Sequence, residues 1–193
     1  ELGDDQIEVA QIGPAGERRV RFAAIINMAN RAHGRTGMGA VMGSKNLKAI
    51  AVRGRWRPPV YDPQALQRLI RQGPAAYEAN LAVKNLGIYG TAGVLAAQNA
   101  AGGQPTRNYT SGFFEGADAI TGERMAETIL KDRDTCYACV VRCKRVVEAE
   151  WRGRRVDPRY GGPEYETLST FGSYCGVSDL EAIALAHQIC AQY

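Results

Sequence analysis

The chain has 193 residues, of which 45% are hydrophobic and 23% charged, and its formal net charge is +4. These proportions are typical of an ordinary soluble globular protein, large enough to bury a core as one domain or as parts of two. No apolar stretch is long enough to span a bilayer, and no signal peptide or low-complexity tract is present. Five cysteines, an odd number with three clustered, argue against a disulfide framework and for a reducing compartment, so we expect a cytoplasmic protein.

Residues 7–60 are rich in glycine and alanine and contain short segments of β type. Ile7–Ile12 alternates loosely, Val20–Ile26 is apolar, and Lys48–Val52 predicts a buried strand. Pro58 and Pro59 close this region and indicate a domain boundary.

Within that region, residues 31–39 form a glycine-rich turn flanked by arginines. Glycine lets backbone amides approach a phosphate, and the forked donors of Arg31 and Arg35 match an oxyanion. The spacing fits neither the dinucleotide fingerprint nor the P-loop. The alternative is a glycine-rich turn that packs against a sheet. Two arginines four residues apart favour the anionic ligand narrowly.

Beyond residue 60 the pattern becomes helical. Asp62 and Pro63 predict the start of a helix that Gly73-Pro74 should interrupt, and a loop is expected from Gly102 to about Gly116. Thr121 should begin a short helix that leads into the cysteines. Ser178, with Glu181 three residues later, predicts a capping box for a terminal helix.

The most informative motif is C-x-x-C-x-x-x-C at Cys136, Cys139 and Cys143. Such runs hold iron–sulfur clusters, usually with a fourth cysteine from a distant part of the sequence. Structural zinc normally needs a second cysteine pair or a histidine pair, and the sequence has neither. Three unconnected core cysteines are the remaining alternative. Cys175 could reach a cluster from a loop, whereas Cys190 lies on or beside the apolar stripe of a terminal helix, which favours packing.

Positive charge gathers after the cysteines. The commonest meaning of such a run is a solvated basic loop. The alternatives are a landing site for an acidic redox partner and a nucleic-acid surface, which only Trp151 and Tyr160 could support by stacking. The residues are Arg142, Lys144, Arg145, Arg152, Arg154, Arg155 and Arg159.

Seven segments, taken in order, resemble the tungsten-containing aldehyde:ferredoxin oxidoreductase family. The similarity covers nearly the whole chain, and motifs in this order are highly specific. Because family members are about three times longer, and because the chain begins without Met and stops inside an expected helix, we interpret it as a fragment. The segments are Ile12–Glu17, Arg31–Arg35, Gly39–Val52, Tyr89–Thr91, Pro105–Tyr109, Cys136–Cys139 and Gly162–Thr167.

The resemblance implies an α+β fold. Residues 1–58 would be the C-terminal part of a β-rich pterin-binding domain. Residues 59–193 would be the N-terminal part of a mainly helical domain that carries the iron–sulfur motif and part of the active site.

The resemblance also implies an activity. Family members oxidise aldehydes to carboxylic acids at a tungsten, occasionally molybdenum, bis-pterin centre, and pass electrons through a 4Fe–4S cluster to ferredoxin. We therefore expect an oxidoreductase whose partners are a small aldehyde and ferredoxin or a similar acidic electron carrier, with no nucleic acid and no membrane. Whether the full-length protein is a homo-oligomer is left open.

Roles follow residue by residue. Arg31, Ala32, Gly34 and Arg35 fall on the pterin-binding segment, and the carbonyl of Ala32 would bind a magnesium that bridges the pterin phosphates. Cys136, Cys139 and Cys143 would be three cluster ligands. Glu166 would be the acid/base beside the metal, with Glu164 as the second candidate.

The family's fourth cysteine and its catalytic histidine are expected outside this chain, so the fragment alone should be inactive. Val140 stands where the family usually has proline, which should change turn stiffness rather than ligation. Three alternatives remain: a non-catalytic 4Fe–4S electron-transfer module, a family member that reduces a carboxylic acid or an aromatic ring, and a zinc-binding nucleic-acid module.

Overall fold

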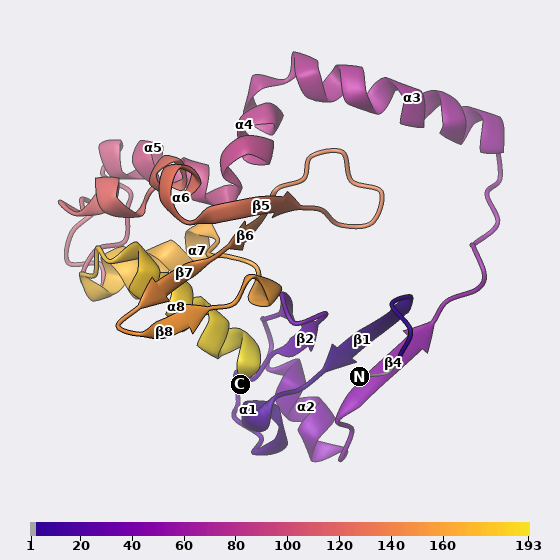
Figure 1. Ribbon diagram of the computed structural model, residues 1–193, viewed down its shortest axis with the longest axis horizontal. Helices are drawn as coiled ribbons and strands as arrows, with labels where there is room; N and C mark the ends of the chain where they lie inside the picture. Colours follow the sequence, from indigo (N-terminus) through magenta and orange to yellow (C-terminus); the bar gives the residue numbers. More distant parts are fainter. Residues whose placement is uncertain (1–2) are drawn as a thin grey trace. The chain divides into compact units, whose positions relative to one another are not determined.

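A computed structural model describes residues 3–193 and mixes helix and sheet, as the predicted α+β class requires (Figure 1). The chain divides into two compact units. Unit 1 runs to Pro59 and includes Ile189–Tyr193, and unit 2 comprises Val60–Gln188. Among residues 3–193, no helix is both long and apolar enough to cross a bilayer.

Unit 1 is built on a four-stranded antiparallel sheet with the order β3-β2-β1-β4. The central strand β1 pairs along its whole length with β4, from Ile7 opposite Arg53 to Gln11 opposite Ala49. The elements of unit 1 are β1 (Ile7–Gln11), α1 (Pro14–Glu17), β2 (Ile25–Asn27), β3 (Arg31–His33), α2 (Met38–Ser44) and β4 (Ala49–Arg53).

The predicted strand near residue 50 forms as β4, but the expectation that it is buried is wrong. All five of its residues are exposed, including Ile50 and Val52. The reason is its position, because β4 is an edge strand that pairs only with β1.

The predicted glycine-rich turn separates into strand, turn and helix. Arg31–His33 is β3, and α2 begins after Gly37, which has φ +67°. A Cβ on Gly37 would lie 2.0 Å from the carbonyl oxygen of Arg21, and one on Gly43 would lie 1.9 Å from that of Gly16. These two glycines are therefore required by backbone packing, as the structural alternative proposed.

Unit 2 is helical for most of its length but also contains two short antiparallel hairpins, β5–β6 and β7–β8, which the sequence did not predict. Its elements are α3 (Pro63–Ala79), α4 (Leu81–Tyr89), η1 (Thr91–Val94), α5 (Leu95–Ala100), η2 (Ala117–Ile120), α6 (Gly122–Thr128), β5 (Leu130–Asp134), β6 (Lys144–Val147), β7 (Ala149–Trp151), β8 (Arg154–Val156), η3 (Pro158–Tyr160), α7 (Tyr165–Thr167), the π-helix η4 (Leu168–Gly172), η5 (Ser173–Cys175) and α8 (Leu180–Gln192), whose last turn belongs to unit 1.

Capping side chains set the beginnings of α3 and α8. Asp62 accepts a hydrogen bond from the backbone N–H of Ala65, which confirms the predicted start of α3. The predicted interruption is wrong, because α3 continues through Pro74 to Ala79; a proline removes one N–H···O=C bond, and the helix tolerates that loss. The cap of α8 is Asp179, which accepts from the N–H of Ala182, rather than the predicted Ser178.

The core of unit 2 lies between α5, α6, the π-helix and α8. Its most deeply buried apolar side chains, each at most 2% exposed, are Leu95, Phe114, Ile120, Met125, Leu168 and Ile183. Because these residues come from segments up to 88 positions apart (183 − 95), the unit closes through long-range contacts rather than local ones.

We predict that Gly43→Ala destabilises unit 1. The added methyl group would clash with the carbonyl of Gly16 and force α1 and α2 apart, which should cost on the order of 1–3 kcal/mol in the free energy of unfolding. Gly54→Ala is the control, because a Cβ there meets nothing within 4 Å. Urea denaturation of both variants tests this, and equal midpoints would contradict it.

Candidate functional site

The three cysteines of the motif lie on one loop, residues 135–143, which joins β5 to β6 (Figure 1). The loop begins and ends at a strand pair, Asp134 opposite Lys144. Cys136 is exposed, and Cys139 and Cys143 are partly buried. The hydroxyl of Thr135 donates to the carbonyl of Cys139 at 2.7 Å, so a side chain of the loop itself holds the first half of the loop.

Two arginines fix the base of this cysteine loop. The guanidinium of Arg142 donates to the carbonyl of Arg133 at 2.6 Å, which joins the end of the loop to β5. Arg145, on β6, is only 4% exposed and donates to the carbonyls of Cys143 (3.2 Å), Arg142 (3.0 Å), Gly87 (2.9 Å) and Ile88. The end of the loop is thereby tied to the end of α4.

The burial of Arg145 has an electrostatic consequence. Desolvation, and secondarily the nearby charge of Arg133, lower the pKa of Arg145, while Cys143 and then Glu164 oppose that shift electrostatically. Arginine nevertheless stays protonated in proteins. A permanent positive charge therefore lies beside Cys143.

The donor set of the cysteine loop fits an iron–sulfur cluster. Three thiols on one short loop are the soft ligands that such clusters take, and the chain supplies no matching histidine pair for zinc. Among residues 3–193 the thiols are not gathered at a single point as a metal-binding group. Their assignment as ligands is therefore a proposal based on their loop and spacing.

The other two cysteines are placed apart from this motif. Cys175 is exposed in η5, and its thiol donates to the carbonyl of Thr170 at 3.1 Å. Cys190 is exposed on the last turn of α8, so the expectation that it packs in a core is wrong.

The two candidate acids sit at the start of α7 in different surroundings. The backbone is extended at Glu164 and helical from Tyr165 onward. The Thr91 hydroxyl accepts from the N–H of Tyr165 at 2.9 Å and donates to the carboxylate of Glu164 at 3.1 Å. Glu166, one position into the helix, is exposed and makes no ion pair within residues 3–193.

The proposed pterin segment lies on β3 and the turn after it. Arg31 is partly buried, whereas Ala32, Gly34 and Arg35 are exposed. A Cβ on Gly34 would meet nothing within 4 Å, and its φ is not positive, so neither packing nor conformation explains glycine there. An open backbone at Gly34, with arginines at positions 31 and 35 of the same segment, fits an anionic ligand.

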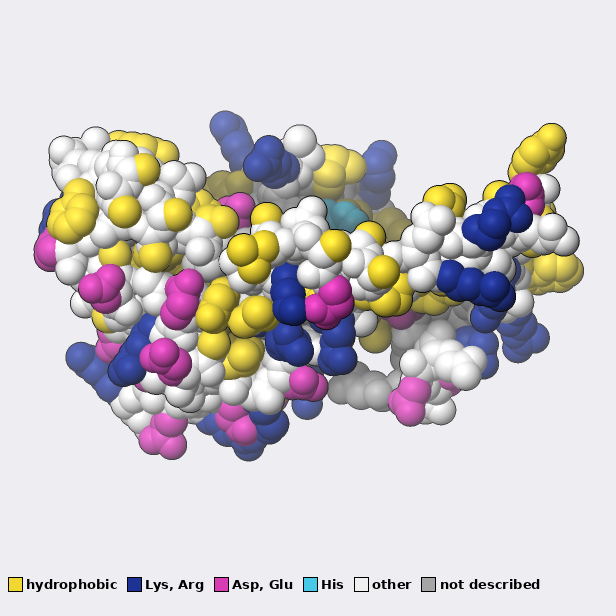
Figure 2. Space-filling view, turned by 90° about the horizontal axis from the view of Figure 1, so that it is seen from above, with side chains coloured by type: hydrophobic (Ala, Val, Ile, Leu, Met, Phe, Trp, Pro, Cys, Tyr) yellow, Lys and Arg dark blue, Asp and Glu magenta, His cyan; other side chains and the backbone are white. Residues whose placement is uncertain are grey.

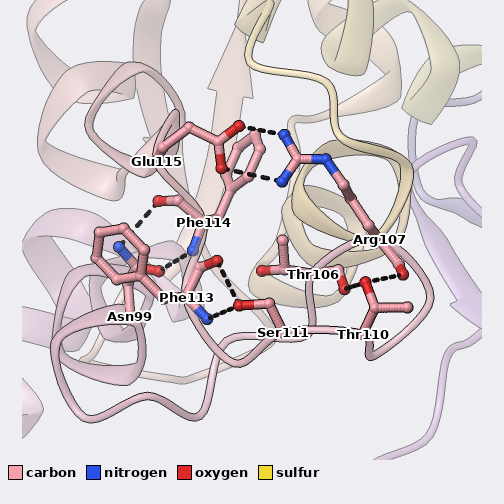
Figure 3. A network of polar contacts seen from close by, with 8 residues as sticks. All are labelled: Asn99, Thr106, Arg107, Thr110, Ser111, Phe113, Phe114 and Glu115. Carbon is pink, nitrogen blue, oxygen red and sulfur yellow. Dashed lines mark hydrogen bonds and ion pairs between the residues drawn. The ribbon is translucent and has the colours of Figure 1, made fainter.

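The expected loop at 102–116 is present and is held by polar contacts (Figure 3). Arg107 forms a fork with both carboxylate oxygens of Glu115 and lies 5.8 Å from the Phe114 ring centroid. Residues 107–109 all have positive φ, a conformation that non-glycine residues rarely adopt. Beneath them, Gln104 is fully buried and accepts a hydrogen bond from the hydroxyl of Tyr165 at 3.2 Å.

The basic stretch after the cysteines is less basic at its surface than its composition suggests. Arg145 is buried, Arg155 pairs with Glu148, and Lys144 lies 3.5 Å from Asp134. The burial of Arg145 and the ion pairs of Lys144 and Arg155 favour the solvated surface over a continuous single-sign patch. The face of the molecule that Figure 2 shows likewise carries both dark blue cationic and magenta acidic side chains.

Comparison with known proteins decides the family. A model described as aldehyde ferredoxin oxidoreductase, domains 2 & 3, matches residues 67–193, and the model of the N-terminal domain of the same family matches residues 1–54. The chain belongs to the aldehyde ferredoxin oxidoreductase family.

Tungsten-containing aldehyde ferredoxin oxidoreductases are among the most similar relatives. Those of Pyrococcus abyssi (strain GE5 / Orsay) and Thermococcus kodakarensis (strain ATCC BAA-918 / JCM 12380 / KOD1) are 42% and 41% identical over 194 residues. Each match covers 100% of this chain and 31% of the relative, so the chain spans about a third of their length.

A solved structure shares the fold. It is the active site complex BamBC of benzoyl coenzyme A reductase in complex with 1,5 dienoyl-CoA, with a TM-score of 0.70 and 23% identity. The match covers 100% of this chain and 30% of that one. At 23% identity, this similarity shows that the two chains share a fold and nothing further.

Sequence reasoning missed three residues that support this segment: Thr91, Gln104 and Arg145. The partners of Thr91 and Gln104 lie 61–74 positions away, beyond the reach of local patterns. A signal existed for Arg145, because it shares a strand face with buried Val147, two residues on.

We predict that Arg107 controls the titration of Glu115. The side-chain hydrogen bond from Arg107 is the main cause that lowers the pKa of Glu115 from 4.5 to about 2. Because the folded pKa is depressed, the stabilisation is complete above pH 4.5 and is lost as the pH falls towards 2. Arg107→Gln should return the pKa of Glu115 towards 4.5.

The measurement is a carboxyl-carbon NMR titration of protein labelled in its glutamates, with Arg154→Gln as the control. A Glu115 that titrates near 4.5 in the unaltered protein would contradict the prediction.

Proposed function

We propose that the full-length protein oxidises aldehydes to carboxylic acids at a tungsten bis-pterin centre and passes the electrons through a 4Fe–4S cluster to ferredoxin. The observation that carries the proposal is the match of both family domains along the chain, at 42% and 41% identity to two tungsten-containing aldehyde ferredoxin oxidoreductases. Because the chain spans about a third of those proteins, the activity, substrate and partner belong to the proposal.

The cysteine loop would hold the cluster through Cys136, Cys139 and Cys143, with the fourth ligand from outside this chain. Cys175 is a poorer candidate because its thiol already donates to the Thr170 carbonyl on a separate segment. The loop between β5 and β6 keeps all three thiols within eight residues, which suits a compact cluster.

Arg31 and Arg35 would bind pterin phosphate, and the carbonyl of Ala32 would bind a magnesium ion there. The open backbone at Gly34 supports this role, since a ligand could approach it closely. Metal analysis of the full-length protein would distinguish tungsten from molybdenum in this centre.

Glu166 would accept the proton of the water that adds to the aldehyde carbon. When bound, the tungsten bis-pterin centre supplies the two-electron acceptor. Glu164 is already hydrogen-bonded to Thr91, whereas the Glu166 carboxylate is exposed and makes no ion pair with a described residue. Of the two acids, Glu166 is therefore better placed to exchange a proton with a ligand.

The electron acceptor would be ferredoxin or another acidic carrier. Arg142, Arg152, Arg154 and Arg159 are exposed on unit 2 and would supply positive charge for that encounter as separate side chains rather than as a continuous patch. We place the protein in the cytoplasm because five cysteines, an odd number with three clustered, argue for a reducing compartment.

We predict that anaerobically purified full-length protein contains tungsten and about four irons per chain. Serine at Cys136, Cys139 or Cys143 should abolish the brown iron–sulfur absorption, because an alcohol is a poor ligand for iron in such a cluster. The matched controls are Cys175→Ser and Cys190→Ser, which should keep it.

Three other results would redirect the assignment. Iron without tungsten or pterin would indicate a non-catalytic electron-transfer module. One zinc in a colourless protein would indicate a zinc site. Loss of the cluster in Cys175→Ser would place the fourth ligand within this chain.

We predict that Glu166→Gln lowers aldehyde turnover at least about tenfold, because general-base catalysis typically contributes about 10²–10⁴ in rate. Tungsten, iron and pterin contents should stay at the level of the unaltered protein, since glutamine has the same shape. Undiminished turnover with full cofactor content would remove Glu166 from the mechanism and direct attention to Glu164.

A further inference from the structure

Arg145 is a buried cation whose hydrogen-bond partners are all neutral. Its guanidinium donates to four backbone carbonyls, those of Gly87, Ile88, Arg142 and Cys143. None of the ion pairs within residues 3–193 includes it, although Glu164 is near enough to attract it electrostatically. Carbonyls satisfy the donors but do not neutralise the charge, so the positive charge persists inside unit 2.

This charge lies at the third cysteine. The Nε of Arg145 is 3.2 Å from the carbonyl oxygen of Cys143, and Nη2 is 3.0 Å from that of Arg142. The position is enforced from the other side by Gly90, with φ +65°, where a Cβ would lie 2.9 Å from the Cys143 carbonyl and 3.0 Å from the Arg145 Nε. Cys143 and Arg145 therefore have little room to move relative to each other.

We propose that Arg145 is a positioning residue for the iron–sulfur cluster. Arg145 holds the backbone of Cys143, thereby orients the Cys143 thiolate, and raises the reduction potential of the cluster. The inference rests on the proposed function, in that the three cysteines must ligate a cluster. Reduction adds one electron, supplied by the titrant, and makes the cluster more negative. A fixed positive charge beside it stabilises that reduced state.

The competing explanation is that Arg145 only caps the end of α4. The carbonyls of Gly87 and Ile88 lie in its last turn, where helix carbonyls lack partners. A cap of this kind would affect folding and cluster loading but not the potential of a cluster that is fully loaded. The two roles are therefore separated by a potential measurement.

The experiment uses the full-length protein, purified anaerobically, with the variants Arg145→Gln and Arg145→Lys. The control is Arg154→Gln, an exposed arginine on β8. Iron content, circular dichroism and the cluster midpoint potential, followed by EPR during a dithionite titration, are measured on each. The glutamine variant removes the charge, whereas the lysine variant keeps it and loses the fork.

We expect Arg145→Gln to lower the equilibrium constant for cluster reduction roughly tenfold, on the Coulomb energy of a unit charge about 10 Å away at an effective dielectric constant of about 20. Tenfold corresponds to about 59 mV for a one-electron couple. Arg145→Lys should stay close to the unaltered potential with normal iron content, and Arg154→Gln should not shift it.

An unchanged potential in an iron-replete Arg145→Gln protein would overturn the inference and leave the proposed function intact. Failure of both Arg145 variants to fold would also overturn it, since the arginine would then serve the fold. If the unaltered protein holds no iron–sulfur cluster, the proposed function fails and the inference fails with it.

Discussion

The hydrogen bonds of the Arg145 guanidinium are the interaction on which the candidate site in unit 2 depends. They join the end of α4 to the last residues of the cysteine loop, and the Cβ of Arg145 lies where a Cβ on Gly162 would come within 3.0 Å. Arg145 therefore contacts α4, the cysteine loop and the residues just before Glu164. Burying a guanidinium is costly unless its donors are used, and here four carbonyls use them.

In unit 1, the close approach of backbone carbonyl oxygens to glycines fixes how the elements pack. Gly37 and Gly43 admit carbonyl oxygens to distances that no Cβ permits, so α2 can follow β3 directly and lie against α1. Gly34 differs, because its surroundings are open. The glycine-rich segment thus contains residues that build the fold and one that the fold does not require, and only the latter supports a binding role.

Sequence patterns correctly predicted the elements whose formation depends on residues close together in the sequence. The start of α3 at Asp62, the loop from Gly102 and the existence of a strand near Lys48–Val52, although not its burial, were correct because a cap, glycines and an apolar run act within a few residues. Strand β5 was missed because Lys131–Asp134 is entirely charged and becomes a strand only by pairing with β6. The cysteine spacing could be interpreted from sequence, whereas the contacts of Arg145 with α4 could not, since its partners lie 57 and 58 positions away.

The hydroxyl of Thr91 gives Glu164 and Glu166 different surroundings. Thr91 accepts from the N–H of Tyr165 and donates to Glu164, so it fixes the point where extended chain becomes helix. A helix that starts there turns Glu166 away from the side occupied by Glu164. The hydroxyl of Tyr165, the residue between them in the sequence, donates to Gln104. One carboxylate is thus hydrogen-bonded within the fold and the other is left exposed, and this difference is the reason why we propose Glu166 rather than Glu164 as the acid/base.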